Sequence, residues 1–344
     1  MKKRIKGCLF TGLLSLTLVL SAGCGSKTES AGDSEGSTSV STSGEAGAEA
    51  ADTSAGSDSE SSDTSGTAEE TTYPLTITDD LGTEVTIEEE PERVVSLSPA
   101  NTETLFAIGA GEKVVGRTDY CDYPEEAAEV ESIGSYSSPN TELILSMTPD
   151  VVFASDYIDD SIRSQIEDTG AKVIVFAAND VDSVKKDIEL AGQILNLNEG
   201  AQEVTETMTQ EMDELQEILA GRTEDKSAFI DLGMYYSAGE GSLLGNMLDD
   251  IGVTNVAADT GEMWPQLSVE KIIEANPDVY ISLYTTAEEL QQTSGLQDMD
   301  CIKNGAIIYY EGTSQEASMI QRSGPRLVEG TRLLAEQIYP ELFE

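Results

Sequence analysis

Short apolar runs alternate with amphipathic stretches along the chain from about residue 73 onward. This alternation is typical of a mostly parallel sheet whose strands are linked by covering helices. Two shorter runs on either side of Asp79-Asp80-Leu81-Gly82 instead predict a β-hairpin over 75–87. We predict strands at 93–98, 113–117, 151–155, 172–176, 228–232, 279–283 and 307–310, and helices at 101–109, 140–147, 159–169, 243–251, 268–275 and 325–338.

The stretch 198–220 has the apolar spacing of one long helix. Its apolar residues recur at three- and four-residue steps, with acidic residues and glutamines between them. A helix of about 20 residues spans roughly 30 Å, the width of a small domain. It could be an ordinary surface helix, but its central position favours a connector between two lobes. The residues that define the spacing are Ala201, Val204, Met208, Met212, Leu215 and Leu219.

One pattern occurs twice, once on each side of this stretch. In both copies an aromatic residue precedes a glutamate, an isoleucine follows it, and Pro-Asp-Val then opens an apolar run, all at the same spacing. The separation of the copies exceeds the ~20–50 residues of solenoid repeats. It predicts two similar lobes, 73–197 and 221–344, with a ligand cleft between them. The first copy contains Tyr136, Glu142 and 149–151, and the second contains Trp264, Glu270 and 277–279.

The N-terminus has the features of an export signal. A basic start precedes an apolar stretch too short to span a membrane as a helix, and Ser21-Ala22-Gly23-Cys24 follows it. The string resembles the lipobox of bacterial lipoproteins, in which the cysteine, here Cys24, carries lipid; the alternative is ordinary signal cleavage. We therefore predict a signal peptide over 1–24. Residues 25–72 contain few aliphatic side chains and are predicted to be a disordered tether.

Charge, the lack of histidine and missing motifs exclude several functions. Lys and Arg number 19 against 65 Asp and Glu, a formal net charge of −46, so nucleic acid is not expected as a partner. The chain has no histidine, which excludes His-dependent triads and the commonest zinc ligand. Dinucleotide-binding, phosphate-loop and nucleophile-elbow motifs are missing, so we expect no enzyme activity, cofactor or metal.

Cys121 and Cys301 fall in different predicted lobes; free thiols are favoured over a disulfide, although an extracytoplasmic location would permit one.

Three strings carry a family resemblance: Ser-Pro-Ala-Asn-Thr-Glu at 98–103, Asp-Tyr-Cys-Asp-Tyr-Pro at 119–124 and Trp-Pro-Gln at 264–266. With them, 73–344 resembles the helix-hinged family of substrate-binding proteins of ABC importers, and its cobalamin branch in particular. The resemblance implies two Rossmann-like α/β lobes joined by a single long α-helix, with the ligand held in the cleft between them. Receptors for ferric siderophores and haem share this scaffold.

The resemblance also implies the ligand site. Flat aromatic surfaces with a few polar groups suit a broad, largely neutral corrin ring, although each tyrosine could equally be a half-buried core residue. One stretch, 318–322, departs from the aspartate and aromatic residues of the cobalamin receptor, which leaves a variant corrinoid or another large ligand open. The implied ligand-binding residues are Ser98, Pro99, Ala100, Tyr120, Tyr136, Tyr235, Tyr236 and Trp264.

Glu142 and Glu270 have a second implied role. In the family, one glutamate on each lobe docks to arginines of the permease. Both residues follow a predicted N-cap, where helix-dipole stabilisation alone would explain a glutamate; the duplicated surroundings favour docking.

The sequence thus predicts a monomeric, lipid-anchored extracytoplasmic receptor that delivers a corrinoid to an ABC permease and its ATPase. A ferric-siderophore or haem receptor is the alternative, and a structural adhesin is disfavoured by the duplicated pattern.

Overall fold

The computed structural model describes residues 69–344, which belong to one compact unit. The predictions for the signal peptide 1–24, for Cys24 and for the tether as far as residue 68 lie outside the described residues. Within the described part, no helix is both long and apolar enough to cross a bilayer.

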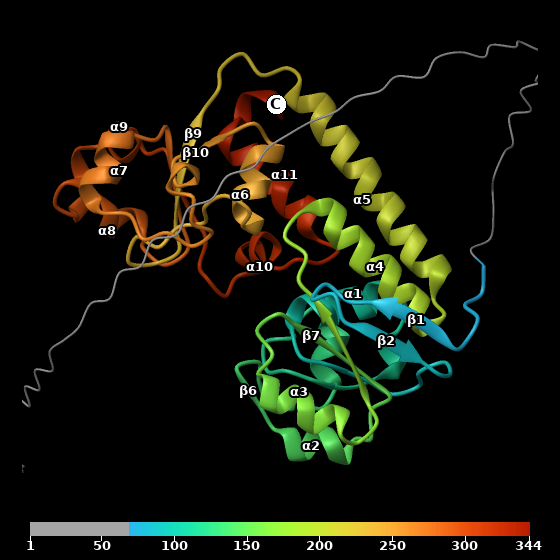
Figure 1. The fold of residues 1–344 in the computed structure, drawn as a ribbon. Helices are drawn as coiled ribbons and strands as arrows, with labels where there is room; N and C mark the ends of the chain where they lie inside the picture. Colours follow the sequence, from blue (N-terminus) through green and yellow to red (C-terminus); the bar gives the residue numbers. More distant parts are fainter. Residues whose placement is uncertain (1–68) are drawn as a thin grey trace, which may run out of the picture. The chain divides into compact units, whose positions relative to one another are not determined.

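The described chain begins with the predicted hairpin, whose strands β1 (Leu75–Thr78) and β2 (Glu84–Ile87) pair antiparallel. A parallel four-stranded sheet follows, in the order β4-β3-β7-β8. We call this sheet and its helices the N-terminal lobe (Figure 1). Its strands are β3 (Val94–Ser96), β4 (Val114–Arg117), β7 (Val151–Ser155) and β8 (Lys172–Phe176), and a short antiparallel pair, β5 (Gly134–Ser135) and β6 (Ser138–Pro139), lies between β4 and β7 in sequence.

The second half of the chain repeats this topology. Its parallel sheet has the order β10-β9-β11-β12, which is again second, first, third and fourth along the chain. We call this sheet and its helices the C-terminal lobe. The predicted fold class of two similar α/β lobes is confirmed, although the two-residue strand β10 was not predicted. The strands are β9 (Ser227–Asp231), β10 (Thr254–Asn255), β11 (Val279–Ser282) and β12 (Ile307–Tyr309).

The duplicated Pro-Asp-Val has the same structural role in both lobes. Each copy opens the third strand of its sheet, β7 or β11. The Asp150 carboxylate accepts hydrogen bonds from the backbone N–H groups of Glu92 and Arg93 at 2.9 Å, directly before the first strand. The Asp278 carboxylate accepts from the N–H and hydroxyl of Ser227, at the start of the equivalent strand, at 2.8 Å. Each aspartate therefore ties the beginnings of two neighbouring strands together.

Helices cover both faces of the N-terminal sheet. Ile144 and Ile166, from α2 and α3, are fully buried against Val95 and Val152 on one face. The other face packs against α1 and α4. α4 was not predicted, although its buried positions follow a helical period. These helices are α1 (Pro99–Ala107), α2 (Thr141–Ser146), α3 (Asp160–Glu167) and α4 (Val181–Leu195), with short 3-10 turns at Gly111–Lys113 and Glu125–Glu129.

The C-terminal sheet is covered in the same way. On one face, Phe229 and Tyr280 pack with α7, α8 and α9, and on the other face lie α6 and α11. The short helices α8, α9 and α10 were not predicted. The helices are α6 (Leu243–Asp250), α7 (Val269–Ala275), α8 (Ala287–Gln292), α9 (Asp300–Asn304), α10 (Gln315–Gln321) and α11 (Leu327–Ile338), with 3-10 turns at Ala258–Thr260, Leu296–Asp298 and Pro340–Leu342.

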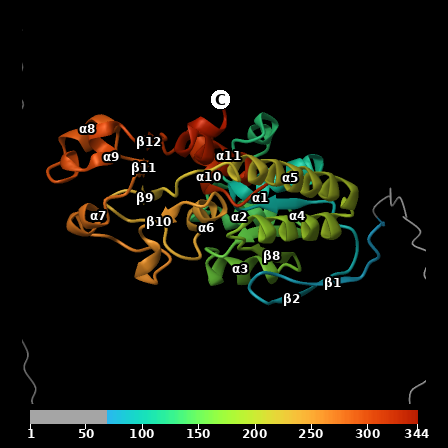
Figure 2. The same cartoon turned by 90° about the horizontal axis from the view of Figure 1, so that it is seen from above.

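The predicted long helix is α5 (Asn198–Leu219), and it links the lobes in sequence. It lies along α4, as both views show, and also contacts α1 and α11 (Figures 1 and 2). Met208 and Leu215 on its buried face belong to one continuous cluster of buried side chains that includes residues of both sheets. Because the lobes share this core, a large hinge motion would have to expose apolar surface.

Residues 69–73 are held to the turn between α4 and α5. Asn196 accepts a hydrogen bond from the N–H of Thr71 at 2.8 Å, and the Asn198 amide donates to the carbonyl of Glu69 at 2.8 Å. The Tyr73 hydroxyl donates to the carbonyl of Ile194 at 2.9 Å. These hydrogen bonds join the last residues of the predicted tether to the folded body.

A buried carboxyl group of α4 makes stability depend on pH. Burial and the neighbouring Asp80 carboxylate raise the pKa of Asp187 to about 8. The unfolded pKa is near 4, so between pH 4 and pH 8 the native state binds more protons and stability falls as pH rises. Between these pH values the free energy of unfolding of the parent protein should fall by up to about 1.4 kcal/mol per pH unit because of Asp187. We expect this contribution to be absent from the Asp187→Asn protein. Chemical denaturation at pH 5 and pH 8 measures it, with Asp182→Asn, an exposed substitution on the same helix, as control.

Candidate functional site

A cavity of about 470 Å³ is lined by residues from both lobes. Its lining follows the carboxyl ends of strands in the two sheets: Ser98 follows β3, Ser155 ends β7 and Tyr284 follows β11. This edge is where parallel α/β sheets bind ligands. The predicted ligand cleft between the lobes is thus present as a cavity. It is lined by Ser98, Pro99, Ala100, Asn101, Tyr120, Asp122, Tyr136, Ser155, Tyr157, Phe176, Tyr284, Gly312, Thr313, Ser318, Gln321, Arg322 and Ser323.

Five of the predicted ligand-binding residues line this cavity. Ser98, Pro99 and Ala100 form the start of α1, where the Ser98 hydroxyl caps the helix by accepting from the N–H of Asn101 at 3.2 Å. Tyr120 and Tyr136 are 58% and 53% exposed, so their rings are available to a ligand. The Ser-Pro string therefore builds the helix start that borders the cleft.

The other three predicted residues do not line the cavity. Tyr235 is half-buried and packs against the core on the α7 face of its lobe. Tyr236 bridges to Gln266, and Trp264, 46% exposed, lies two residues before that bridge. The loop after β9 nevertheless lies next to the cleft, because its Gly233 faces the ring of Tyr284, which lines the cavity. A Cβ atom added at Gly233 would be 3.4 Å from that ring.

Sequence reasoning missed two cleft tyrosines, Tyr157 and Tyr284. They are 70% and 61% exposed, and both line the cavity. Each stands two residues beyond the last residue of the third strand of its sheet, after Ser155 and Ser282, so Ser-x-Tyr occurs at matching places in the two lobes. This repeated triplet is the signal that could have identified them. Partial desolvation and the nearby Asp156 carboxylate raise the pKa of Tyr157.

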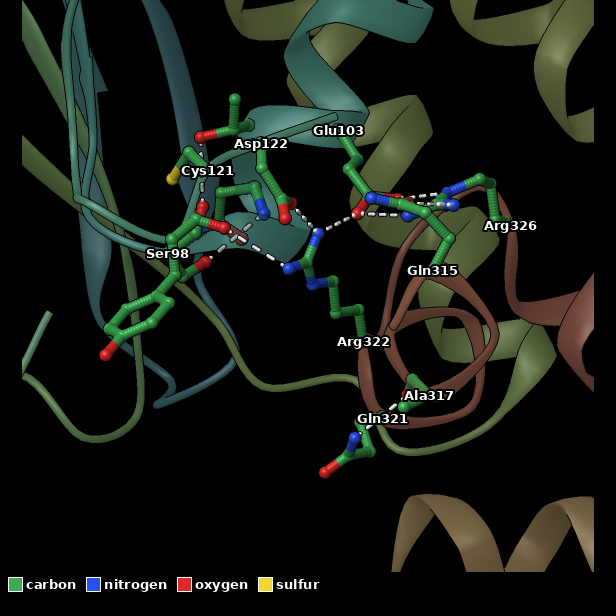
Figure 3. A network of polar contacts seen from close by, with 12 residues as sticks. Ser98, Glu103, Cys121, Asp122, Gln315, Ala317, Gln321, Arg322 and Arg326 are labelled. Atoms are coloured by element: carbon green, nitrogen blue, oxygen red, sulfur yellow. Dashed lines mark hydrogen bonds and ion pairs between the residues drawn. The ribbon is translucent and has the colours of Figure 1, made fainter. Parts of the chain in front are cut away.

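The charged side chains that line the cavity are Asp122 and Arg322, and they pair with each other. The Arg322 guanidinium donates to Asp122 at 2.8 Å and to the buried Glu103 at 2.7 Å (Figure 3). A second arginine, Arg326, donates to both Glu103 oxygens at 2.8 Å. Two carboxylates and two guanidinium groups thus balance, and the cavity presents no unpaired charge.

The stretch that departs from the cobalamin receptor forms one wall of the cavity. Ser318 and Gln321 belong to α10, and Arg322 and Ser323 follow it. This wall carries small and polar side chains, whereas exposed tyrosines supply much of the rest of the lining.

Glu142 and Glu270 occupy equivalent exposed positions in the first turns of α2 and α7. The N-cap residues Asn140 and Ser268 accept from the N–H groups of Leu143 and Lys271, as predicted. Hydrogen bonds from its own backbone N–H and from Ser268 lower the pKa of Glu270, which favours its charged form.

Both described cysteines, Cys121 and Cys301, are buried free thiols. Burial raises the pKa of each, which makes them poor nucleophiles. Among residues 69–344, no group of three or more His, Cys, Asp or Glu side chains could hold a metal ion.

Two similar α/β lobes around a shared ligand-sized cavity define a two-lobed binding protein. Residues 94–313 match the periplasmic binding protein family, and the chain belongs to that family of substrate-binding proteins. It is 34% identical to an uncharacterized ABC transporter substrate-binding lipoprotein, YvrC, of Bacillus subtilis, over 79% of this chain and 88% of the relative. It is 28% identical to a cobalamin-binding protein of Halobacterium salinarum, over 78% and 75% of the two chains.

Solved structures agree with the fold. The periplasmic heme-binding protein RhuT from Roseiflexus, in its apo form, superimposes with a TM-score of 0.65 and 25% identity. The match covers 73% of this chain and 99% of that one.

Proposed function

We propose that this chain is a lipid-anchored extracytoplasmic receptor that captures a corrinoid and delivers it to an ABC permease. Cys24 carries the lipid in this proposal, and 25–68 link the anchor to the folded body. The cobalamin-binding relative from Halobacterium salinarum and the lipoprotein relative from Bacillus subtilis support the ligand class and the anchor, respectively.

The observation that carries the ligand class is a tyrosine-lined cavity with no unpaired charge. Four exposed tyrosines, two from the segments after β4 and β5 and one after each third strand, offer flat faces and hydroxyl groups. A corrin ring is broad and apolar on its faces and carries amide groups at its edge. Such a ligand would stack on the rings and hydrogen-bond to the polar wall of Ser318 and Gln321.

Titration of the purified receptor with cyanocobalamin tests the proposal. We expect one-to-one binding by calorimetry and a shifted corrin absorption spectrum. Cobinamide, which lacks the nucleotide arm, should also bind, because in this proposal the ring faces supply most of the contacts. Absence of both heat and spectral change at high micromolar concentrations of the two corrinoids would overturn the proposal.

A haem receptor is the second candidate function. It is favoured by the similarity to RhuT and by the exposed tyrosines, because the phenolate of tyrosine is an axial ligand of haem iron and this chain has no histidine. The neutral cavity argues against it, since haem propionates need cationic partners. A Soret shift on adding haem, together with no response to corrinoids, would establish this alternative.

For Glu142 and Glu270 we propose permease docking, one glutamate from each lobe. The double substitution Glu142→Ala with Glu270→Ala should lower the uptake of radiolabelled cobalamin by cells at least tenfold, because paired charges fix the orientation of docking. Ligand affinity in solution should not change. Glu274→Ala, exposed on the same helix as Glu270, serves as the control. Uptake unaffected by the double substitution would leave only the capping role for the two glutamates.

A further inference from the structure

Arg322 crosses from the C-terminal lobe to the N-terminal lobe, where it contacts α1 and the loop 120–123. Its guanidinium makes three contacts there: Nη1 donates to Glu103 at 2.7 Å and to Asp122 at 2.8 Å, and Nη2 donates to the Tyr120 carbonyl at 3.2 Å (Figure 3). Only 15% of the side chain is exposed. Although Arg322 lines the cavity, both of its terminal nitrogens, Nη1 and Nη2, already donate to acceptors within the protein.

Arg326 holds the same loop from a second point. Its guanidinium stacks over the Tyr123 ring at 3.7 Å from the centroid and forms two 2.8 Å hydrogen bonds with Glu103. Glu103 belongs to α1 and is 3% exposed. Its carboxylate therefore binds two arginines of the opposite lobe in a buried position. Residues 120–123, which carry the cleft residues Tyr120 and Asp122, are thereby fixed from across the cavity.

From this arrangement we propose that Arg322 is a positioning residue that holds the Tyr120 loop, and that its pairing with Asp122 makes the cleft select neutral or cationic ligands over anionic ones. This inference rests on the proposed function. An anionic group that approached Arg322 would meet the Asp122 carboxylate, 2.8 Å from the same nitrogen, and would have to displace it. Repulsion by that carboxylate offsets the attraction of the guanidinium. A free arginine at this position would have the opposite preference.

Asp122→Asn tests the selectivity. It keeps the size and a hydrogen-bond acceptor while removing the negative charge beside Arg322. We expect the ratio of the affinity for haem, used as an anionic macrocyclic probe, to the affinity for cyanocobalamin to rise at least tenfold. Asp119→Asn removes one charge from an exposed neighbour that does not line the cavity and serves as the matched control. If Asp122→Asn lowered the affinity for both probes equally, the role of Asp122 would be only structural. Any other result that left this ratio unchanged would also overturn the proposed selectivity.

Hydrogen exchange of the free protein tests the positioning role without any ligand. In Arg322→Gln, amides of 118–123 should exchange at least tenfold faster than in the parent protein. Those of 232–236, the loop after β9 that receives no hydrogen bond from Arg322, should not change. Unchanged exchange at 118–123 would overturn the positioning role. If the parent protein binds no corrinoid but the loop is released in this variant, the proposed function fails while the positioning role stands.

Discussion

Glu103→Gln should lower the free energy of unfolding by about 3–5 kcal/mol, the largest stability effect that we expect of any isosteric substitution in this chain. The Glu103 side chain is 2% exposed and forms ion pairs with Arg322 and Arg326. Breaking a buried pair from one side leaves guanidinium groups in a site of low polarity without their counter-charge. Urea denaturation followed by far-UV circular dichroism measures the loss.

Glu336→Gln is the control for this prediction. Glu336 pairs with Arg332 at 3.2 Å, and their side chains are 43% and 38% exposed. Exposed pairs of this kind contribute about 0–1 kcal/mol. A Glu103→Gln protein within about 1 kcal/mol of the parent would contradict the view that this carboxylate is a principal polar link between the lobes.

Tyr157→Ala combined with Tyr284→Ala should weaken corrinoid binding about 100-fold. Each ring lines the cleft from a different lobe, and a stacked aromatic side chain typically contributes roughly 1–3 kcal/mol to binding of a flat ring, so each single substitution should cost about tenfold. Calorimetric titration with cyanocobalamin provides the affinities.

Tyr309→Ala provides a matched comparison, because Tyr309 is 39% exposed on β12 and does not line the cavity. It should leave affinity unchanged. If the double substitution also had little effect, the ligand would have to bind elsewhere, and the surface around Trp264 would be the next place to examine.

Periodicity predicted most of the fold. Strands buried on both sides of a parallel sheet appear as continuous apolar runs, which is why β7 and β8 were predicted with the same bounds as observed. The identical strand order of the two sheets follows the duplicated Pro-Asp-Val pattern. Elements with few residues, such as β10 and α9, carry too little periodic signal to be recognised.

The candidate site was predicted less completely. Tyr120 and Tyr136 were indicated by family resemblance, whereas Tyr157 and Tyr284 follow strand ends, whose location a single sequence gives only approximately. The pairing of Glu103 with Arg322 joins residues 219 positions apart. No local pattern encodes such a contact, because it depends on how the two lobes face each other.

The carboxylates of Asp150 and Asp278 secure the first strand of each sheet, and neither residue lines the cleft. Cargo specificity and this architectural signature can therefore diverge independently. The two aspartates at this spacing identify the scaffold, whereas the ligand that the scaffold carries is encoded elsewhere in the chain. Cargo has to be inferred from the side chains that follow the strand ends.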